Sequence, residues 1–432
     1  MTDVERSPRC LAMVTPAWPP GAAPNGIVTY TSHLAPAFRQ RGTRTVLLAW
    51  DVPKGSGPNE KTADDVDLID IADFQPGRSL LGKAAARVRR WLPASDFDDA
   101  KFAMIVRAVR AALARFPIEL LEIEEAFGLA SRIIKLKRIP VVTRLQGPWF
   151  LNGEVLGEKK DAAFLQRVEQ ERLSIAWADG ITSPSQDILD RTRDYYGLPL
   201  EGARVIPCPI DPRPEDRPWK LADADPNRIL FVGRFDLHKG ADLMIDAFGR
   251  LAPSRPSLYL DFVGPDRGIP DPSKGRIGVV DYIKGRISDS SVADRIVIHG
   301  QKRPDEIDDF RRRASVTVVP SRYETFGYTA VEALRLGCPL VAADSGGLGE
   351  IVRDGETGLL FPAGNVELLA SQIDRLLANS ELGARLGEAG RLDVGTRYHP
   401  TAIAEMTLDL YASVVERWRP SRARGGLSRP TA

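Results

Sequence analysis

The chain has 432 residues, of which 43% are hydrophobic and 27% charged, with 59 Lys and Arg against 58 Asp and Glu. This composition excludes a disordered chain, a collagen and a membrane bundle. The near-neutral charge excludes a protein built as a whole to coat nucleic acid. At roughly 150 residues per domain, the length predicts two or three domains. Three cysteines are too few for a disulfide framework and Met1–Arg9 is polar, so we expect a cytoplasmic protein.

The first elements in chain order form a strand–loop–helix–strand unit. The apolar run Cys10–Thr15 predicts a buried strand, and Pro16–Gly26 is a loop rich in proline and glycine. Apolar residues then recur at helical spacing over Ile27–Arg41, and Thr45–Ala49 predicts the next strand.

The same unit recurs after the middle of the chain. Arg228–Gly233 predicts a strand, Arg234–Gly240 a loop, Ala241–Leu251 a helix and Leu258–Gly264 another strand. Strands separated by helices favour parallel sheets covered on both faces. We therefore predict an α/β protein with two doubly wound, Rossmann-like domains. Three further strands are expected at Ile296–Gly300, Val316–Pro320 and Leu340–Asp344.

The prolines of Val205–Arg217 indicate the boundary between the two domains. We predict an N-terminal domain of residues 1–209 and a C-terminal domain of residues 210–399. A last helix is expected over Pro400–Trp418, with no strand after it. Residues 420–432 are rich in Arg, Gly and Ser, which is typical of a disordered tail.

The strongest candidate for a binding site is the segment PSRYETFGYTAVEALRLGCP at Pro320–Pro339. Glu324 follows a predicted strand, and Glu332 lies about two turns into the next helix. Ligands bind at that edge of a doubly wound sheet, where a helix N-terminus suits phosphate and carboxylates suit a vicinal diol. By spacing alone, a surface helix with solvated glutamates explains the pattern equally well. The backbone N–H groups that open this helix belong to Phe326, Gly327, Tyr328 and Thr329.

Two glycine-containing loops are weaker candidates. In GRFDLHKG, Arg234 and Lys239 stand in an exposed loop beside Gly233, and two cations suit a diphosphate. In WPPGAAPNG, Gly21 and Gly26 let the backbone approach a ligand at a helix start. A solvated loop and a plain strand-to-helix turn are the alternatives.

Taken together, these motifs resemble the GT-B glycosyltransferases, and more closely the large retaining nucleotide-sugar family numbered four. The resemblance is carried by PSRYETFGYTAVEA, VGRFDLHKG, the opening WPPGAAPNGIVTY, and SGGLGEIVRDGETGLL at Ser345–Leu360. It runs from about Arg9 to Trp418. It implies a sugar donor linked to UDP or GDP, and retention at the anomeric carbon.

The resemblance assigns catalytic roles to three residues. Arg234 and Lys239 would neutralise the donor diphosphate, whose charge grows in the transition state, and Glu324 would face the donor sugar. These cations replace a metal, so no metal and no other cofactor is expected. The resemblance also favours front-face attack, in which a donor phosphate oxygen takes the acceptor proton.

The resemblance implies that the remaining donor contacts come from both domains. Glu332 would hold the ribose hydroxyls, and Gly26 would approach the diphosphate from the N-terminal domain. The helix Pro400–Trp418 resembles one that crosses back to that domain. The other donor-binding positions are Gly233, Phe326, Gly327, Tyr328 and Thr329.

The acceptor is expected on the N-terminal domain, near Glu122–Gly128 and Gln146–Gly153. Many relatives carry histidine where TRLQGP has Gln146, and Gln can hydrogen-bond a hydroxyl but cannot shuttle a proton. Trp149 and Phe150 either stack on a sugar or pack internally. The partner would be a sugar or a lipid-linked acceptor of polysaccharide, lipopolysaccharide or glycolipid synthesis.

Several alternatives stay open. An epimerase or a sucrose-type synthase could use the same fold, and so could a sugar-nucleotide scaffold without activity. Asp-x-Asp triplets at 65–67, 96–98 and 223–225 are read as solvated acids rather than metal ligands. Residues 77–93 predict a basic amphipathic helix, either packed on the domain or in peripheral contact with the inner membrane face.

Overall fold

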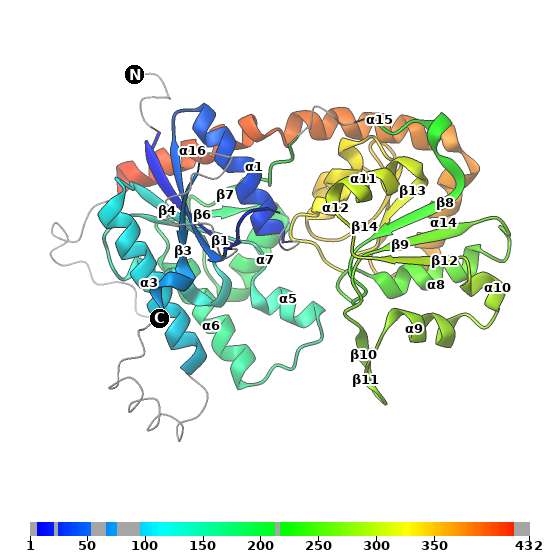
Figure 1. The fold of residues 1–432 in the computed structure, drawn as a ribbon, viewed down its shortest axis with the longest axis horizontal. Helices are drawn as coiled ribbons and strands as arrows, with labels where there is room; N and C mark the ends of the chain where they lie inside the picture. The colour runs from blue at the N-terminus through cyan, green and yellow to red at the C-terminus, as the bar shows by residue number, and fades with distance from the viewer. Residues whose placement is uncertain (1–6, 21–24, 53–65, 76–95, 212–216, 419–432) are drawn as a thin grey trace.

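The computed structural model describes residues 7–20, 25–52, 66–75, 96–211 and 217–418. Within these ranges two parallel sheets, each with helices on both faces, lie side by side along the long axis of the molecule (Figure 1). The α/β fold class predicted from the sequence is therefore confirmed. The predicted amphipathic segment 77–93 and the tail 420–432 lie outside the described residues.

The N-terminal sheet has the strand order β3-β2-β1-β4-β5-β6-β7, and every neighbouring pair is parallel. The chain reverses its direction across the sheet between β1 and β4, which makes that position a topological switch point. The strands are β1 Cys10–Ala17, β2 Arg44–Asp51, β3 Asp67–Asp70, β4 Leu120–Glu124, β5 Val141–Arg144, β6 Gly180–Ser183 and β7 Arg204–Val205. The helices are α1 Gly26–Gln40, α3 Asp96–Arg115, α4 Leu129–Ile134, α5 Trp149–Val155, α6 Ala162–Trp177 and α7 Gln186–Tyr196, with short 3₁₀ turns η2 Ile71–Phe74 and η3 Ala126–Gly128.

The C-terminal sheet has the order β12-β9-β8-β13-β14-β15, so its switch point lies between β8 and β13. Its strands are β8 Asp225–Val232, β9 Tyr259–Val263, β12 Ile296–Gly300, β13 Ala314–Val319, β14 Leu340–Asp344 and β15 Leu359–Pro362, and β10 Ile269–Asp271 pairs with β11 Gly275–Ile277 in a separate hairpin. The helices are α8 Ala241–Leu251, α9 Val279–Arg286, α10 Ser290–Ala293, α11 Pro304–Arg313, α12 Tyr328–Arg335, α13 Gly347–Ile351, α14 Val366–Ala378 and α15 Ser380–Arg397, preceded by the 3₁₀ turn η4 Leu221–Asp223.

The last helix, α16 (Pro400–Arg417), returns to the N-terminal domain, as the family resemblance implies (Figure 1). It packs against α1, where the rings of Phe38 and Tyr411 lie 6.1 Å apart. The Tyr411 hydroxyl also donates a 2.6 Å hydrogen bond to the buried carboxylate of Glu122 on β4. The two domains are therefore joined by a helix as well as by the chain near residue 210.

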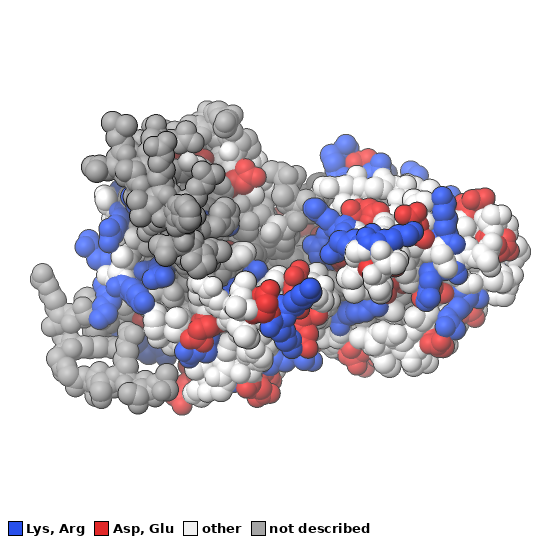
Figure 2. Space-filling view, turned by 90° about the horizontal axis from the view of Figure 1, so that it is seen from below, with Lys and Arg blue, Asp and Glu red and all other residues white. Residues whose placement is uncertain are grey.

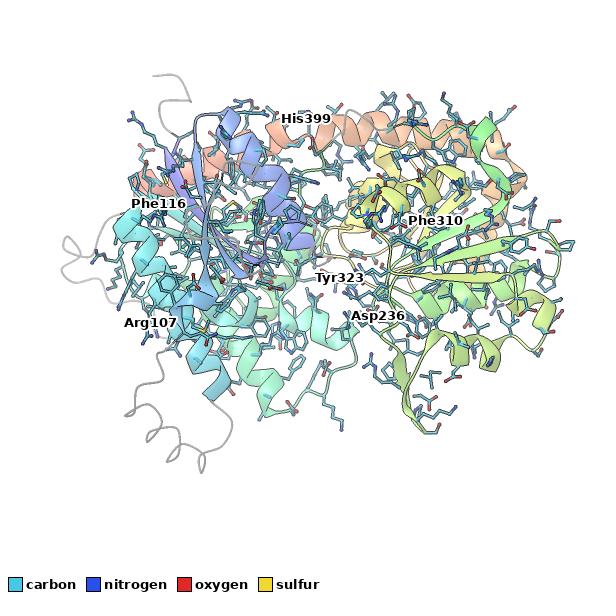
Figure 3. All side chains as sticks on the ribbon, in the orientation of Figure 1. Arg107, Phe116, Asp236, Phe310, Tyr323 and His399 are labelled. Atoms are coloured by element: carbon cyan, nitrogen blue, oxygen red, sulfur yellow. The ribbon has the colours of Figure 1, made fainter. Side chains whose placement is uncertain are left out.

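A second set of contacts ties the loop after β13 to the N-terminal domain. The Ser185 hydroxyl donates to the carbonyl of Thr325, and Tyr323 donates to Asp187 at 2.8 Å. The Glu350 carboxylate accepts the first N–H groups of α7, from Gln186 and Asp187. A carboxylate from one domain thus caps a helix of the other. Tyr323 lies between the two domains in Figure 3.

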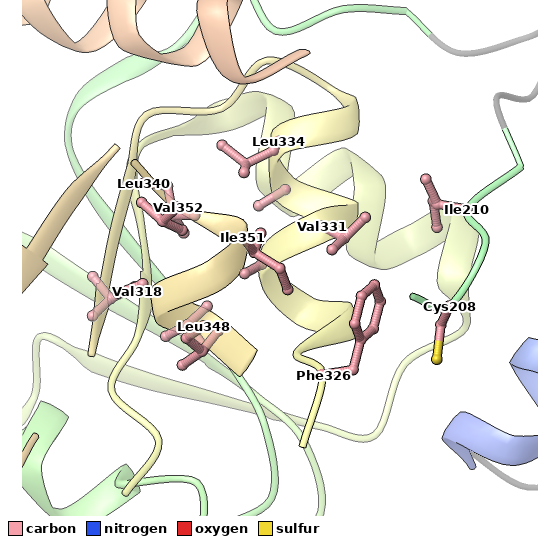
Figure 4. Packing of buried hydrophobic residues seen from close by; sticks show 14 of the residues in the cluster. Cys208, Ile210, Val318, Phe326, Val331, Leu334, Leu340, Leu348, Ile351 and Val352 are labelled. Atoms are coloured by element: carbon pink, nitrogen blue, oxygen red, sulfur yellow. The ribbon is translucent and has the colours of Figure 1, made fainter. Parts of the chain in front are cut away.

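A buried apolar cluster supports the start of α12 (Figure 4). Phe326 packs with Val331 of α12 and with Leu348 and Ile351 of α13, and all four are at most 5% exposed. Gly327 has φ +114°, and a Cβ there would lie 2.7 Å from Leu348. Only glycine therefore fits at this position, because of both the backbone angle and the close packing.

Among the described residues, no helix is long and apolar enough to cross a bilayer. On the face drawn in Figure 2, Lys and Arg are interspersed with Asp and Glu over the C-terminal domain. Cys10, Cys208 and Cys338 are buried as free thiols.

Candidate active site

The loops after β8 and β13 meet at the switch point of the C-terminal sheet. They carry Arg234 and Lys239 on one side and Glu324 on the other, as the sequence predicts. The Lys239 ammonium donates a 2.6 Å hydrogen bond to Oε1 of Glu324, although 85 residues separate them. The hydroxyl of Ser321 donates to the same oxygen at 2.7 Å. We call the group formed by Arg234, Asp236, Lys239 and Glu324 the ion-pair edge.

Glu324 is buried, yet it is held in its ionised form. Burial alone would raise its pKa, but the charges of Lys239 and His238 and the hydrogen bonds from Lys239 and Ser321 lower it below the ordinary value. The Lys239 side chain is only 22% exposed, so its predicted place in an exposed loop is wrong. The loop folds inward there because the buried carboxylate needs a cation.

Arg234 lies nearer to solvent and pairs with a carboxylate that the sequence analysis did not single out. Its Nε donates to Oδ2 of Asp236 at 2.7 Å, and its side chain is 43% exposed. The other oxygen of Asp236 accepts the backbone N–H of Lys239 at 2.8 Å. Asp236, labelled in Figure 3, therefore holds the guanidinium of Arg234 and the backbone of Lys239. Its position between Arg234 and Lys239 in GRFDLHKG could have identified it from the sequence as a partner of these cations.

The backbone of the two loops is packed too closely for larger residues. A Cβ on Gly233 would lie 2.9 Å from the ring of Phe231. Gly327 precedes α12, which begins at Tyr328, so the N–H groups of Tyr328 and Thr329 lie in its first turn and lack intrahelical partners. The predicted helix N-terminus is therefore present beside Glu324, and it suits an anion.

Gly26 brings the N-terminal domain up to the same place. It is the first residue of α1, and a Cβ there would lie 3.6 Å from the ring of Tyr328. Gly26 therefore lies beside the first residue of α12, and its approach to a diphosphate stays a prediction. Asn25 caps this helix, since its side chain accepts the N–H of Ile27 at 2.8 Å.

Glu332 lies on α12 about one turn after its first residue, Tyr328, and its side chain is 33% exposed. Its Oε2 accepts a 2.6 Å hydrogen bond from Arg311 of α11, which also pairs with Asp308 at 2.9 Å. Arg311 is 2% exposed, a rare environment for this residue type. Arg311 could not be recognised from the sequence, because it is one of three consecutive arginines at the end of α11 and nothing in the pattern marks the buried one.

At the N-terminal domain, β4 and the residue after it carry three buried carboxylates, and Gln146 lies just beyond the end of the neighbouring strand β5. Glu122 accepts hydrogen bonds from Tyr411 and, at 3.3 Å, from Tyr30. The Glu125 carboxylate accepts the backbone N–H groups of Gln146 at 2.9 Å and Gly147 at 2.8 Å. We call Glu122, Glu124, Glu125 and Gln146 the acidic edge.

A pocket opens at the acidic edge beneath the first turns of α1. The pocket has room for about one water molecule, and the predicted acceptor-side residue Gln146 is one of its lining residues. Burial raises the pKa of Glu124 to about 7, and the nearby charge of Glu122 contributes to the rise. The lining residues are Met13, Val14, Ile27, Tyr30, Thr31, Glu122, Ile123, Glu124, Arg144 and Gln146.

The aromatic pair after Gln146 packs internally. Phe150 is 5% exposed and stacks on Tyr195 with ring centroids 4.0 Å apart. The ring of Trp149 is covered by the guanidinium of Arg167 at 3.7 Å and lies 6.1 Å from that of Phe164. Of the two alternatives left open for this pair, the structure therefore favours packing.

In the ranges that the structure describes, no cluster of three or more His, Cys, Asp or Glu side chains could hold a metal ion. His299 instead pairs with Asp261 at 2.8 Å in the C-terminal sheet. The two edges present cations, carboxylates and backbone N–H groups, which suit the recognition of anions and hydroxyls.

Two Rossmann-like domains that face each other through such loops define the GT-B class of glycosyltransferase folds. Residues 24–213 match the family described as Glycosyltransferase Family 4, and residues 212–393 match Glycosyl transferases group 1. The chain belongs to this group 1, family 4 set of GT-B proteins, so the resemblance inferred from the motifs is confirmed.

Several named proteins are similar to this chain in sequence. D-inositol 3-phosphate glycosyltransferase of Streptomyces bingchenggensis is 29% identical over 297 residues, which cover 67% of this chain and 65% of that protein. Mannosylfructose-phosphate synthase of Agrobacterium fabrum is 26% identical over 57% of this chain and 56% of its own. The chain therefore spans less than two thirds of the length of these relatives. A longer match, 25% identical, covers 95% of this chain and 99% of D-inositol 3-phosphate glycosyltransferase 1 of Catenulispora acidiphila.

Solved structures share the fold over almost the whole length. Sucrose-phosphate synthase from Thermosynechococcus elongatus superposes with a TM-score of 0.73 and 22% identity, covering 94% of this chain and 99% of that one. Anabaena HepE in complex with UDP-glucose superposes with a TM-score of 0.66 and 18% identity over the same shares. At these identities the likeness establishes the fold.

Proposed function

We propose that the protein transfers a sugar from a nucleoside diphosphate sugar to an acceptor hydroxyl, with retention at the anomeric carbon. The ion-pair edge is the observation that carries this proposal. Arg234 and Lys239 stand at a topological switch point next to a helix N-terminus, and each is already paired with a carboxylate. A bound diphosphate would be contacted by these cations and by the free N–H groups of α12.

The leaving group gains charge as the bond to the sugar breaks. Fixed cations and N–H dipoles stabilise that charge without having to reorganise, which is the main source of catalysis in this scheme. Glu324 is occupied by Lys239 and Ser321, so it orients the sugar rather than attacking it. Retention then follows front-face attack, in which a donor phosphate oxygen accepts the proton of the acceptor hydroxyl.

The proposed reaction needs no metal, because the two cations and α12 neutralise the diphosphate. Transfer should therefore persist in EDTA. Loss of transfer on chelation, followed by recovery with Mg²⁺ or Mn²⁺, would contradict this scheme. The proposed setting is cytoplasmic synthesis of polysaccharide, lipopolysaccharide or glycolipid.

A screen of nucleotide sugars by thermal shift tests the donor site first. UDP-glucose is the natural starting ligand, since HepE was solved with it, and GDP-mannose is the GDP-linked alternative. At 100 times its dissociation constant, a true donor should stabilise the fold by about 2.7 kcal/mol. NMR of the glycosylated product then reports the anomeric configuration. An epimerase would convert the donor without any acceptor, and a scaffold would bind the donor without turnover.

A further inference from the structure

The loop that carries Glu324 is held by side chains of the opposite domain. Tyr323, which precedes Glu324, is 5% exposed, and its hydroxyl donates a 2.8 Å hydrogen bond to Oδ2 of Asp187 on α7. The carbonyl of Thr325, which follows Glu324, accepts a 2.7 Å hydrogen bond from the hydroxyl of Ser185. Ser185 is 1% exposed and is the residue before α7. Both neighbours of the buried carboxylate are therefore bound by the start of α7.

The backbone of Glu324 is fixed by α13, and α13 also holds α7. The carbonyl of Glu324 accepts the N–H of Gly347, the first residue of α13, at 2.7 Å. The carboxylate of Glu350, on the same helix, accepts the N–H groups of Gln186 and Asp187, each at 2.9 Å. The loop, α7 and α13 thus form a closed ring of contacts, and displacement of α7 would remove the hydrogen bonds on both sides of Glu324.

A cation of α7 supports the same contact. Arg191 donates to Asp187 at 3.0 Å, and its guanidinium lies 5.5 Å from the centre of the Tyr323 ring. Asp187 is thereby held in position, and a fixed acceptor fixes the tyrosine hydroxyl that bonds to it.

The groups proposed to bind the diphosphate have supports of their own. Asp236 holds the guanidinium of Arg234 and the backbone of Lys239 within the C-terminal domain. The start of α12 rests on the buried cluster of Phe326 and Leu348. Loss of the α7 contact should therefore affect the loop of the carboxylate more than the diphosphate site.

We propose that Ser185 and Asp187 are positioning residues, which set the orientation of Glu324 toward the donor sugar from the opposite domain. This inference rests on the proposed glycosyl transfer, in which Glu324 orients the sugar. The part of the site that recognises the sugar is then complete only when α7 is docked on the C-terminal domain, whereas the diphosphate site is built within that domain.

Binding measurements separate the sugar from the diphosphate. The probes are UDP-glucose or GDP-mannose, whichever stabilises the wild-type protein, and the matching UDP or GDP. In Ser185→Ala, Asp187→Ala and Tyr323→Phe, the dissociation constant of the nucleotide sugar should rise roughly tenfold, because hydrogen bonds to a carboxylate contribute about that factor. The dissociation constant of UDP or GDP should stay close to wild type. A general loss of structure would weaken both.

Matched variants assign the effect to the hydrogen bond. Asp187→Asn keeps an oxygen that accepts the tyrosine hydroxyl, so it should bind the nucleotide sugar like wild type. Asp190→Ala is the control on the same helix, since that side chain is 53% exposed. Asp187→Ala combined with Tyr323→Phe should be no weaker than the weaker single variant, because both remove the same contact.

Hydrogen exchange provides a second measurement that needs no ligand. The amides of residues 321–326 should exchange faster in Asp187→Ala than in wild type, and at the wild-type rate in Asp187→Asn and Asp190→Ala. Wild-type affinity for the nucleotide sugar in all three contact variants, or equal weakening of the nucleotide sugar and of UDP or GDP, would overturn the inference. A wild-type protein that binds neither nucleotide sugar would contradict the proposed function, and the exchange rates would still show whether α7 holds the loop.

Discussion

The two domains present carboxylates to each other in opposite electrostatic settings. At the ion-pair edge, Glu324 and Asp236 each bind a cation at 2.6–2.7 Å. At the acidic edge, Glu122 is held by tyrosine hydroxyls and Glu125 by backbone N–H groups. Glu124 has one oxygen with no described partner.

The pKa shifts follow this division. The pKa of Glu324 is lowered, since Lys239 outweighs burial. Burial raises the pKa of Glu124 to about 7 and, with the charge of Glu171, that of Glu125 to about 8, even though backbone N–H groups oppose the rise. Similar burial therefore leads to opposite pKa shifts, because charges and hydrogen bonds outweigh burial at Glu324 but not at Glu124 or Glu125.

The different settings of the carboxylates suit the two edges to different substrates of the proposed reaction. Cations that already have carboxylate partners are held in position before the donor arrives, so they need little rearrangement to meet a diphosphate. Carboxyl groups without cations are suited to neutral hydroxyls, because they can bind them in either protonation state. Substitutions at the ion-pair edge and at the acidic edge test this difference between the two domains.

The largest effect is expected when the buried ion pair is broken. Lys239→Ala leaves Glu324 buried and without its cation, and such a loss typically costs about 3–5 kcal/mol of unfolding free energy. Glu324→Gln in the same protein removes the uncompensated charge, so the double variant should recover much of that loss. Urea unfolding of both single variants and the double variant measures the coupling. Additive effects would show that Lys239 and Glu324 do not form a stabilising pair.

Arg234→Ala should act on transfer and leave the fold intact. The side chain is 43% exposed, so its pair with Asp236 contributes little to stability. Loss of one group that stabilises the leaving charge should lower kcat at least a hundredfold, which corresponds to about 2.7 kcal/mol. Arg250→Ala is a matched control, since Arg250 pairs with Glu367 on an exposed face of the same domain. Transfer close to wild type in Arg234→Ala would remove Arg234 from the donor site.

Much of the C-terminal domain could be predicted from the pattern of residues alone. The strands Ile296–Gly300 and Leu340–Asp344 and the helix Ala241–Leu251 agree to the residue. Apolar runs between turn residues specify such elements locally, and alternation of strand and helix specifies the parallel sheet. The loops with Arg234 and Glu324 could then be placed at one edge, because parallel strands end together.

The partners across that edge could not be predicted. Which carboxylate meets Lys239 depends on how β8 and β13 pair, 85 residues apart. The exposure of Glu124 depends on side chains from β1, α1 and β5, and no local pattern distinguishes it from Glu122 or Glu125. Charge and spacing therefore identify a candidate site, whereas burial and pairing, which determine its chemistry, arise from the tertiary structure.

The contribution of Glu124 at the acidic edge to the stability of the native state should change with pH in the opposite direction from that of Glu324 at the ion-pair edge. A carboxyl group whose pKa rises on folding destabilises the native state as pH rises from its unfolded value near 4.5 through about 7. Glu124→Gln should therefore gain stability relative to wild type between pH 5 and pH 9, by at most about 3 kcal/mol at 1.36 kcal/mol per pKa unit. Glu324→Gln should show its deficit above the unfolded pKa of Glu324 and lose that deficit in acid. Thermal unfolding across pH measures the stability of both variants relative to wild type. If this stability difference changed with pH in the same direction for both variants, the predicted contrast between the two edges would be wrong.

Gln146→Ala should give the smallest effect and tests how the acidic edge holds its ligand. Its backbone N–H bonds to Glu125 remain in the variant, so the loop should keep its conformation. Removing one neutral hydrogen bond to an acceptor hydroxyl typically costs about 0.5–1.5 kcal/mol, or roughly three- to tenfold in KM for the acceptor. Gln146→Glu adds a further anion to the pocket and should weaken binding of a phosphorylated acceptor more than that of a neutral one. Steady-state kinetics with donor held at saturation measures both variants. A Gln146→Ala protein that binds donor normally but shows no transfer would mean that this amide takes part in the chemical step, and the acidic edge would then do more than bind the acceptor.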